Sequence, residues 1–235
     1  MRQTRTVFIV ATFFAISFSY AVDREMKTYD HILFEKIAST GLSLESFNYA
    51  LNGYNRICDS LQTNFRYLFI ADFLKPSSEK RLYVIDMQDS SLFHSDFVAH
   101  GRNSGELYAE SFSNTMHSYQ SSLGFYLISE CYDGKHGLSI RLDGLDKGFN
   151  DCARERAIVM HAADYAEPSF IATGGRLGRS QGCPALPHSG FAKVTSCFKE
   201  KSLLFIYYPE KNYLSQSVWL SKQNQMYALP IAEKP

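Results

Sequence analysis

The chain has 235 residues, of which 45% are hydrophobic and 14% aromatic, and its 24 basic residues balance 24 acidic ones. This composition supplies ample material for a buried core, and the length fits one domain, or one domain with an appendage. A near-neutral chain lacks the concentrated positive field that nucleic-acid binding usually needs, which argues against a nucleic-acid partner.

The first 21 residues have the three-part pattern of a secretory signal peptide. Arg2 and Arg5 precede an apolar run from about Val7 to Phe18, and residues 19–21 place small side chains at positions −3 and −1 of a cleavage site. The run is shorter than the ~20 residues that usually span a bilayer, so a cleaved signal is favoured over a membrane anchor. We expect a periplasmic or otherwise exported protein that meets the membrane only through this transient signal.

Residues 22–62 form the predicted N-terminal helical segment. Apolar residues recur at spacings of three and four from Tyr29 to about Cys58, and Thr40 and Gly41 interrupt the pattern. The sequence therefore predicts a helical hairpin that packs on the domain that follows it.

Residues 63–209 form the predicted main domain, where the hydrophobic pattern changes to that of strands. The candidate strands are 67–73, 81–87, 91–101, 123–132, 136–142, 157–163 and 202–209. A turn at residues 133–135 predicts a hairpin, and residues 189–200 predict a short helix. This order indicates a mainly β fold with a few helices (α+β) and a mostly antiparallel sheet. Residues 210–235 remain as a C-terminal extension.

The stretch RLGRSQGCPALP (176–187) places a thiol in a stiff turn that contains glycine. Gly182 allows a sharp turn and a close backbone approach to a ligand, and Pro184 fixes the backbone that follows Cys183. Such a turn can direct the amides of Gly182 and Cys183 at one oxygen, where they would stabilise a developing negative charge. We interpret Cys183 as a candidate nucleophile; a structural loop cysteine is the alternative.

A base for this nucleophile is available in His161, in the middle of the apolar strand AIVMHAA (157–163). A histidine on an apolar strand is more often a satisfied core residue, but a strand also holds a general base rigidly in place. A cysteine paired with a histidine is an activated nucleophile for acyl transfer. Ser180 then orients the loop or contacts the pair.

Two other interpretations of the same loop have weaker support. Residues 178–182 fit G-x-S-x-G, but the preceding strand, the helix directly after it and the downstream acid and histidine of a hydrolase elbow are missing. A zinc site made of His161, Cys183 and His188 lacks paired ligand spacing. We expect neither a metal nor a cofactor.

The number of cysteines is odd, which leaves at least one thiol unpaired within an exported chain. The other four either form two disulfides or are small buried side chains, and the sequence leaves both possibilities open. The five are Cys58, Cys131, Cys152, Cys183 and Cys197.

Five motifs occur in order over about residues 80–187. They are VAHGRNSG (98–105), SSLGFY (121–126), YDGKHGLSIRLDGL (132–145), IVMHAADY (158–165) and GRLGRSQGCPAL (175–186). They resemble the YkuD-type L,D-transpeptidases, and most closely the murein L,D-transpeptidase catalytic domain family. The resemblance implies a β-sandwich of two sheets with a short helix, and a reduced Cys183.

The resemblance also implies a reaction. The Cys183 thiolate, after His161 takes its proton, would attack the amide between an L-centre and D-alanine in a peptidoglycan stem peptide. D-alanine would leave, and an amine of a second stem, or of a protein lysine, would resolve the thioester to a cross-link. Resolution by water would make the protein a carboxypeptidase or endopeptidase instead. A non-catalytic wall-binding module with the same fold is a third possibility.

The sequence departs from the wider family pattern on both sides of the cysteine. Gln181 replaces the histidine of the S-H-G-C pattern, and Pro184 and Ala185 replace a hydrophobic residue and an arginine. The arginine that would meet a substrate carboxylate must therefore come from elsewhere. The candidate catalytic residues are Cys183, His161, Gly182 and Ser180, and the candidate substrate-binding residues are Arg176, Arg179, His100 and Gly101.

Overall fold

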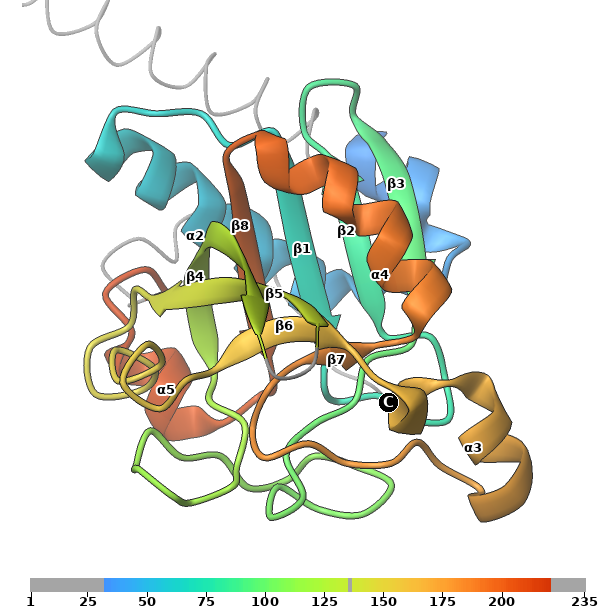
Figure 1. The fold of residues 1–235 in the computed structure, drawn as a ribbon. Coiled ribbons are helices and arrows are strands. Elements are labelled where there is room, and N and C mark those ends of the chain that lie inside the picture. Colours follow the sequence, from blue (N-terminus) through green and yellow to red (C-terminus); the bar gives the residue numbers. More distant parts are fainter. Residues whose placement is uncertain (1–31, 135–136, 221–235) are drawn as a thin grey trace, which may run out of the picture.

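The structure is a computed structural model that describes residues 32–134 and 137–220 (Figure 1). The predicted signal peptide and part of the predicted turn at 133–135 lie outside these ranges. Within them, no helix is both long enough and apolar enough to cross a bilayer. The boundaries predicted at 62/63 and 209/210 stay predictions.

Each of the seven predicted strands corresponds to an observed strand, and one two-residue strand was not predicted. The strands are β1 (Tyr67–Asp72), β2 (Leu82–Asp86), β3 (Ser91–Asp96), β4 (Gly124–Gly134), β5 (Gly137–Gly144), β6 (Val159–Ala162), β7 (Ala185–Leu186) and β8 (Ser202–Tyr207). The mainly β fold with a few helices is thereby confirmed.

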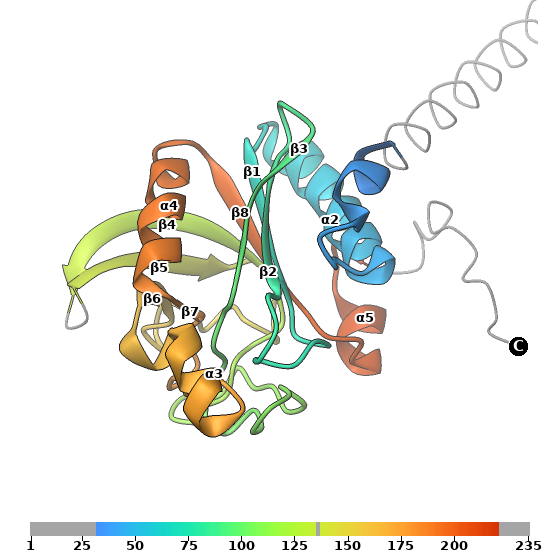
Figure 2. The same cartoon turned by 90° about the vertical axis from the view of Figure 1, so that its right-hand side faces the viewer.

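The described strands form one continuous sheet in the order β3-β2-β1-β8-β4-β5-β6-β7, rather than the two sheets of the expected sandwich (Figure 1). The physical reason lies in β4, which pairs with β8 through residues 124–128 and with β5 up to Gly134. A register shift between Ile128 and Cys131 interrupts its pairing with β5. Such bulges bend a strand, and β4 and β5 curve away from β1, β2 and β8 (Figure 2).

Most strand pairs are antiparallel, as predicted, but β1 pairs with β8 and β6 pairs with β7 in parallel. The second parallel pair places His161 opposite Ala185. It therefore brings the chain just before β7, which contains Cys183, alongside β6.

Helices cover both faces of the central strands. The α2 helix (Leu44–Leu61) and the α4 helix (His188–Val194), which η2 (Thr195–Lys199) extends, lie on opposite sides of the sheet (Figure 2). The Ser43 side chain accepts a hydrogen bond from Ser46 N and so caps the start of α2. Residues 32–38 are also helical, and a turn at 39–41 separates them from α2; their arrangement as a hairpin stays a prediction.

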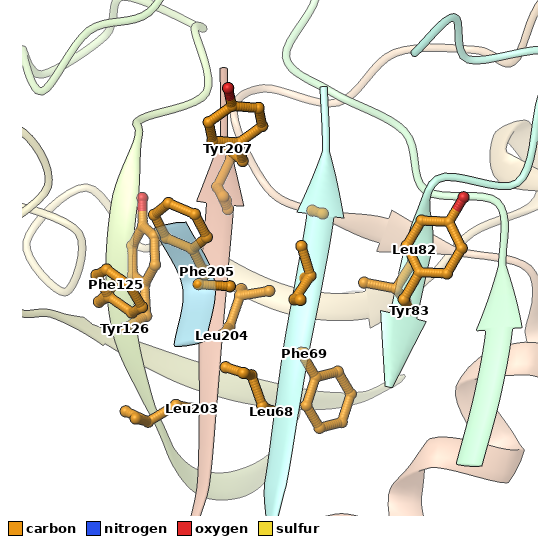
Figure 3. Close-up of a cluster of buried hydrophobic side chains, with 14 of the residues drawn as sticks. Leu68, Phe69, Leu82, Tyr83, Phe125, Tyr126, Leu203, Leu204, Phe205 and Tyr207 are labelled. Atoms are coloured by element: carbon orange, nitrogen blue, oxygen red, sulfur yellow. The ribbon is translucent and has the colours of Figure 1, made fainter. Parts of the chain in front are cut away.

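The core is centred on β1, β4 and β8, where aromatic and aliphatic side chains interlock (Figure 3). All residues of β1 and β8 are buried, as expected for strands with helices on both faces. Phe125 and Phe205 stack at a centroid distance of 4.2 Å. This packing provides the rigid support from which the outer strands β5, β6 and β7 extend.

Two α-helices and the short 3-10 helix η1 (Asp164–Ala166) were not predicted. The α3 helix (Pro168–Gly174) starts with a proline and buries none of its residues, so it carries no amphipathic pattern. The α5 helix (Lys211–Gln216) lies within the predicted extension and buries Tyr213.

Candidate active site

Cys183 and His161 line the same pocket, a cavity of about 610 Å³. His161 lies on β6, and Cys183 lies two residues before β7, the parallel neighbour of β6. The amide of Val159, two residues before His161, points to Cys183 Sγ at 3.5 Å. The parallel register therefore brings the two predicted reactive side chains to one cavity.

Strand alternation explains which side chains of β6 face this cavity. Met160 is fully buried in the core, whereas Val159 and His161 line the pocket. This is the period of two expected for a strand. Ser139, directly opposite His161 on β5, also lines the pocket.

The orientation of His161 is suited to a general base. Nδ1 lies 2.9 Å from the carbonyl oxygen of Ala162. Because a carbonyl only accepts, we assign the proton to Nδ1, which leaves the lone pair of the neutral ring on Nε2. The Tyr165 hydroxyl lies 3.5 Å from Nε2. The Ala162 carbonyl is the third member of this arrangement. Because it is a backbone group, the residue type at position 162 could not have predicted its role.

The Cys183 thiol is half-buried and lies 3.8 Å from the carbonyl oxygen of Ala157. Burial raises its pKa, while the Val159 amide and the charge of Arg156 lower it. The net effect is upward, so the thiol is protonated at neutral pH, and formation of the thiolate would require a base.

Ser180 holds the turn that carries the thiol. Its hydroxyl donates to the Cys183 carbonyl at 2.7 Å and accepts from Gly182 N at 3.0 Å. These contacts support the role predicted for Ser180 in orienting the loop. The hydroxyl is only 5% exposed and engaged on both sides, unlike the nucleophile of a hydrolase elbow.

The same contact corrects one expectation about Gly182. Its amide donates to Ser180 Oγ, so the prediction that this amide points at a substrate oxygen is wrong. The residue matters instead for the shape of the turn. It adopts φ +123°, and a Cβ there would lie 2.8 Å from the carbonyl oxygen of Gln120.

His100 and Gly101 were predicted to bind substrate, but neither lines the pocket, and the structure places both behind its wall. His100 is 1% exposed; its Nδ1 accepts from Arg81 Nη2 at 2.7 Å, and its Nε2 donates to Gly105 O at 3.2 Å. Burial, and then the charge of Arg81, lower its pKa to about 3. Its carbonyl accepts from Ser180 N at 2.9 Å, and Gly101 forms a bridge to Ser180. Both residues therefore support the cysteine loop.

The two predicted carboxylate-binding arginines share one partner. Arg176 and Arg179 both pair with Glu106, at 2.8 Å and 2.6 Å. Of the two, Arg179 lines the pocket and Arg176 does not. The sequence interpretation treated Arg176 and Arg179 as equivalent candidates, whereas in the structure only Arg179 lines the pocket.

With this geometry in place, similarity to known proteins becomes informative. Residues 38–207, well over half of the chain, match the family described as the L,D-transpeptidase catalytic domain. The chain belongs to this family. No curated protein matches the chain.

Solved structures of L,D-transpeptidases are similar to the chain at low identity. An L,D-transpeptidase from Mycobacterium smegmatis is 11% identical with a TM-score of 0.39, over 62% of this chain and 60% of that one. L,D-transpeptidase 3 from Mycobacterium tuberculosis is 11% identical with a TM-score of 0.39, over 62% and 63%. The matched region thus spans less than two thirds of these two relatives. An L,D-transpeptidase from Xylanimonas cellulosilytica is 11% identical with a TM-score of 0.35, over 71% and 81%.

Several pocket residues of this L,D-transpeptidase domain were missed by the sequence interpretation, among them Tyr165 and Arg156. Tyr165 stands in the motif IVMHAADY, four residues after His161, and that spacing was the available signal. Arg156 lines the pocket and contacts a loop some 40 positions earlier in the chain, through Ser113 O and Ser122 Oγ. No local pattern marks such a contact.

All five cysteines of the domain are free thiols. The alternative of two disulfides is therefore wrong. Cys183 in particular is a free thiol, as the sequence interpretation required.

The histidine next to the site has its own partner. His188 Nε2 lies 2.8 Å from Asp164 Oδ1, on an exposed surface. Across residues 32–134 and 137–220, no group of three or more histidine, cysteine or acidic side chains could hold a metal ion.

Proposed function

We propose that this L,D-transpeptidase domain is an exported cysteine acyl transferase that acts on peptidoglycan stem peptides. The observation that carries the proposal is the shared pocket of Cys183 and His161, with His161 Nδ1 bound to the Ala162 carbonyl. That bond leaves Nε2 as the proton acceptor. Membership of the family supports the substrate class.

In the first half of the reaction, His161 Nε2 takes the proton of the Cys183 thiol. The sulfur attacks the carbonyl carbon between an L-centre and D-alanine, and the electron pair moves to the carbonyl oxygen. When this pair returns, the carbon–nitrogen bond breaks and the imidazolium protonates the leaving amine. D-alanine departs, and the acyl group remains on sulfur as a thioester.

In the second half, an amine of another stem peptide attacks the thioester carbon. His161 takes a proton from the attacking nitrogen, the carbon–sulfur bond breaks, and the sulfur regains a proton. The product is a cross-link. Attack by water in place of the amine would yield trimmed stems, so the identity of the products separates transfer from hydrolysis.

The first prediction concerns the nucleophile. We expect Cys183→Ala to lower product formation from purified stem peptides at least about a thousandfold, because no other group of the site can hold the acyl chain. Mass spectrometry of the products measures this loss. Exposure to a carbapenem, a strained cyclic amide, should add one adduct to the wild-type mass and none to C183A.

Cys131→Ala is the matched control, because Cys131 is a free and exposed thiol outside the pocket. It should keep both the activity and the adduct. Full activity in C183A, or an adduct that persists there, would reject the assignment of the nucleophile.

Export is the second part of the proposal and is supported by the pattern of residues 1–21. N-terminal sequencing of the chain recovered from a cell-envelope fraction should give a start near Val22. A full-length chain in the cytoplasmic fraction would contradict export.

A further inference from the structure

The guanidinium of Arg156 is fixed at the edge of the pocket by four hydrogen bonds. Nη1 donates to Ser113 O at 2.7 Å and to Ser122 Oγ at 2.5 Å. Nη2 donates to Ser118 Oγ at 3.2 Å and to Gln120 O at 2.6 Å. Two carbonyls and two hydroxyls thus determine where this positive charge lies.

None of these four partners carries a negative charge. In the part of the chain that the structure describes, Arg156 forms no ion pair with a carboxylate, whereas Arg179, the other arginine of the pocket, has Glu106 at 2.6 Å. Arg156 is also half-buried, so solvent screens its charge less than at an exposed site. Of the two arginines that line the pocket, Arg156 is therefore the one whose charge has no carboxylate partner among the described residues.

This charge lies against the turn that carries the thiol. A Cβ built on Gly182 would be 3.4 Å from Arg156 Nη2, so the guanidinium packs on the residue directly before Cys183. Both Arg156 and Cys183 line the pocket.

We propose that Arg156 is a positioning residue whose fixed positive charge stabilises the Cys183 thiolate. The consequence of this charge, a nucleophile that forms more easily, rests on the proposed acyl transfer. The test of the charge itself needs no peptide substrate. The charge opposes the effect of burial, which raises the pKa of the thiol.

Other groups share the pocket with the sulfur and contribute to its titration. His161 lines the same pocket as the sulfur and is the proposed base, so the measured value belongs to the cysteine–histidine pair. The further charged or titratable side chains that line the cavity are His117, Tyr119, Tyr132, Glu155, Tyr165 and Arg179. All of them are unchanged in the variants below, so a difference between variants reports on Arg156.

The test is the rate at which iodoacetamide alkylates Cys183 as a function of pH, resolved from the other cysteines by peptide mass spectrometry. We expect Arg156→Gln to raise the apparent pKa of this reaction by about 1 unit and to slow alkylation about tenfold at neutral pH. Arg156→Lys keeps a charge without the four-bond geometry and should fall between R156Q and the wild type.

Arg154→Gln is the matched control. Arg154 lies two residues earlier, is exposed, and pairs with Glu130 and Asp143 away from the pocket. Its variant should alkylate as the wild type does. A circular-dichroism melt of each variant establishes that it is folded.

An unchanged alkylation pKa in folded R156Q would overturn the proposal, even if activity fell, because a purely structural role would leave the thiol unmoved. If R156Q does not fold, Arg156→Met, which keeps an aliphatic chain of similar length without the charge, decides, and a wild-type pKa in that folded variant overturns the proposal. A wild-type protein that makes no acyl product, with a raised pKa in R156Q, would reject the proposed function and leave this inference standing.

Discussion

At the scale of single residues, the backbone of Gly182 has almost no conformational freedom, and its side-chain position has almost no space. Its φ of +123° lies in a region that other residues rarely adopt, and the carbonyl oxygen of Gln120 occupies the space beside its Cα. Its amide donates to Ser180 Oγ, and its carbonyl accepts from Ser121 Oγ at 3.3 Å. Both backbone groups of Gly182 are hydrogen-bonded, and there is no room for a side chain. A substitution at this residue would therefore displace Cys183 directly.

We therefore expect Gly182→Ala to lower the free energy of unfolding by more than about 2 kcal/mol, through backbone strain and overlap with Gln120. The activity of the remaining folded protein should also fall. Gly148→Ala is the control, because Gly148 has φ +84° but nothing within 4 Å of a Cβ. It should cost about 1 kcal/mol and leave activity unchanged. Urea denaturation measures both; equal costs would refute the role of the close contact.

Sequence reasoning at this scale found the residues whose chemistry resides in the side chain and missed those defined by backbone contacts. Cys183 and His161 are reactive residue types, and a thiol in a glycine turn stands out. The engagement of the Gly182 amide by Ser180, and of His100 by Arg81, depends on hydrogen-bond partners that no pattern displays. The role proposed for Arg156 depends on a loop distant in the chain.

At the scale of elements, the strands could be predicted because each is a short run of aromatic and β-branched residues. Their partners could not. Parallel and antiparallel neighbours of a fully buried strand have the same local pattern, so the β1–β8 and β6–β7 pairs were not foreseen. The pairing of β4 with both β8 and β5, and the bulge that interrupts its pairing with β5, likewise depend on contacts between strands.

The α5 helix lies beyond the family match, which ends at residue 207, and it contacts residues of the matched region. Tyr213 is fully buried, and its hydroxyl lies 3.4 Å from Asp146 Oδ2. Ser217 Oγ donates to the same carboxyl group, and Trp219 Nε1 donates to Leu145 O at 2.9 Å. These contacts attach the predicted extension, at least up to Leu220, to the catalytic domain.

If this segment is part of the folded unit, Tyr213→Ala should lower the free energy of unfolding by about 3–5 kcal/mol, the usual cost of removing a buried aromatic ring. Tyr108→Ala is the control, because Tyr108 is 44% exposed. It should change stability by less than about 0.5 kcal/mol. Urea denaturation followed by fluorescence gives both values. A wild-type midpoint for Y213A would mean that α5 contributes nothing to the fold.

At the scale of the whole molecule, two buried titratable groups respond to pH in opposite directions. Burial, and then Arg81, lower the pKa of His100 from its ordinary 6.5 to about 3. Burial raises the pKa of Asp146 from its ordinary 3.8 to about 6, although Ser217, the Phe125 amide and Tyr213 partly oppose the shift. One group lies behind the cysteine loop and the other under α5.

The sign of each contribution follows from which state binds more protons. Between pH 3 and 6.5 the unfolded chain protonates His100 and the folded chain does not, so stability from His100 is complete above 6.5 and is lost as pH falls. Between pH 3.8 and 6 the folded chain keeps a proton on Asp146 that the unfolded chain releases, so stability from Asp146 is lost as pH rises. From pH 4 to 6 the two effects oppose each other.

Comparing the wild type with a variant that lacks one of these groups should therefore isolate the pH dependence that this group contributes. Each full titration contributes about 1.4 kcal/mol per pH unit. From pH 4 to 6, the stability of the wild type relative to His100→Asn should rise by up to about 3 kcal/mol, and relative to Asp146→Asn it should fall by a similar amount. Urea denaturation at pH 4, 5 and 6 provides the free energies. Because the wild type and each variant are compared at the same pH, the contributions of all other titrating groups cancel. If the differences in unfolding free energy did not vary with pH, neither group would titrate as its burial requires.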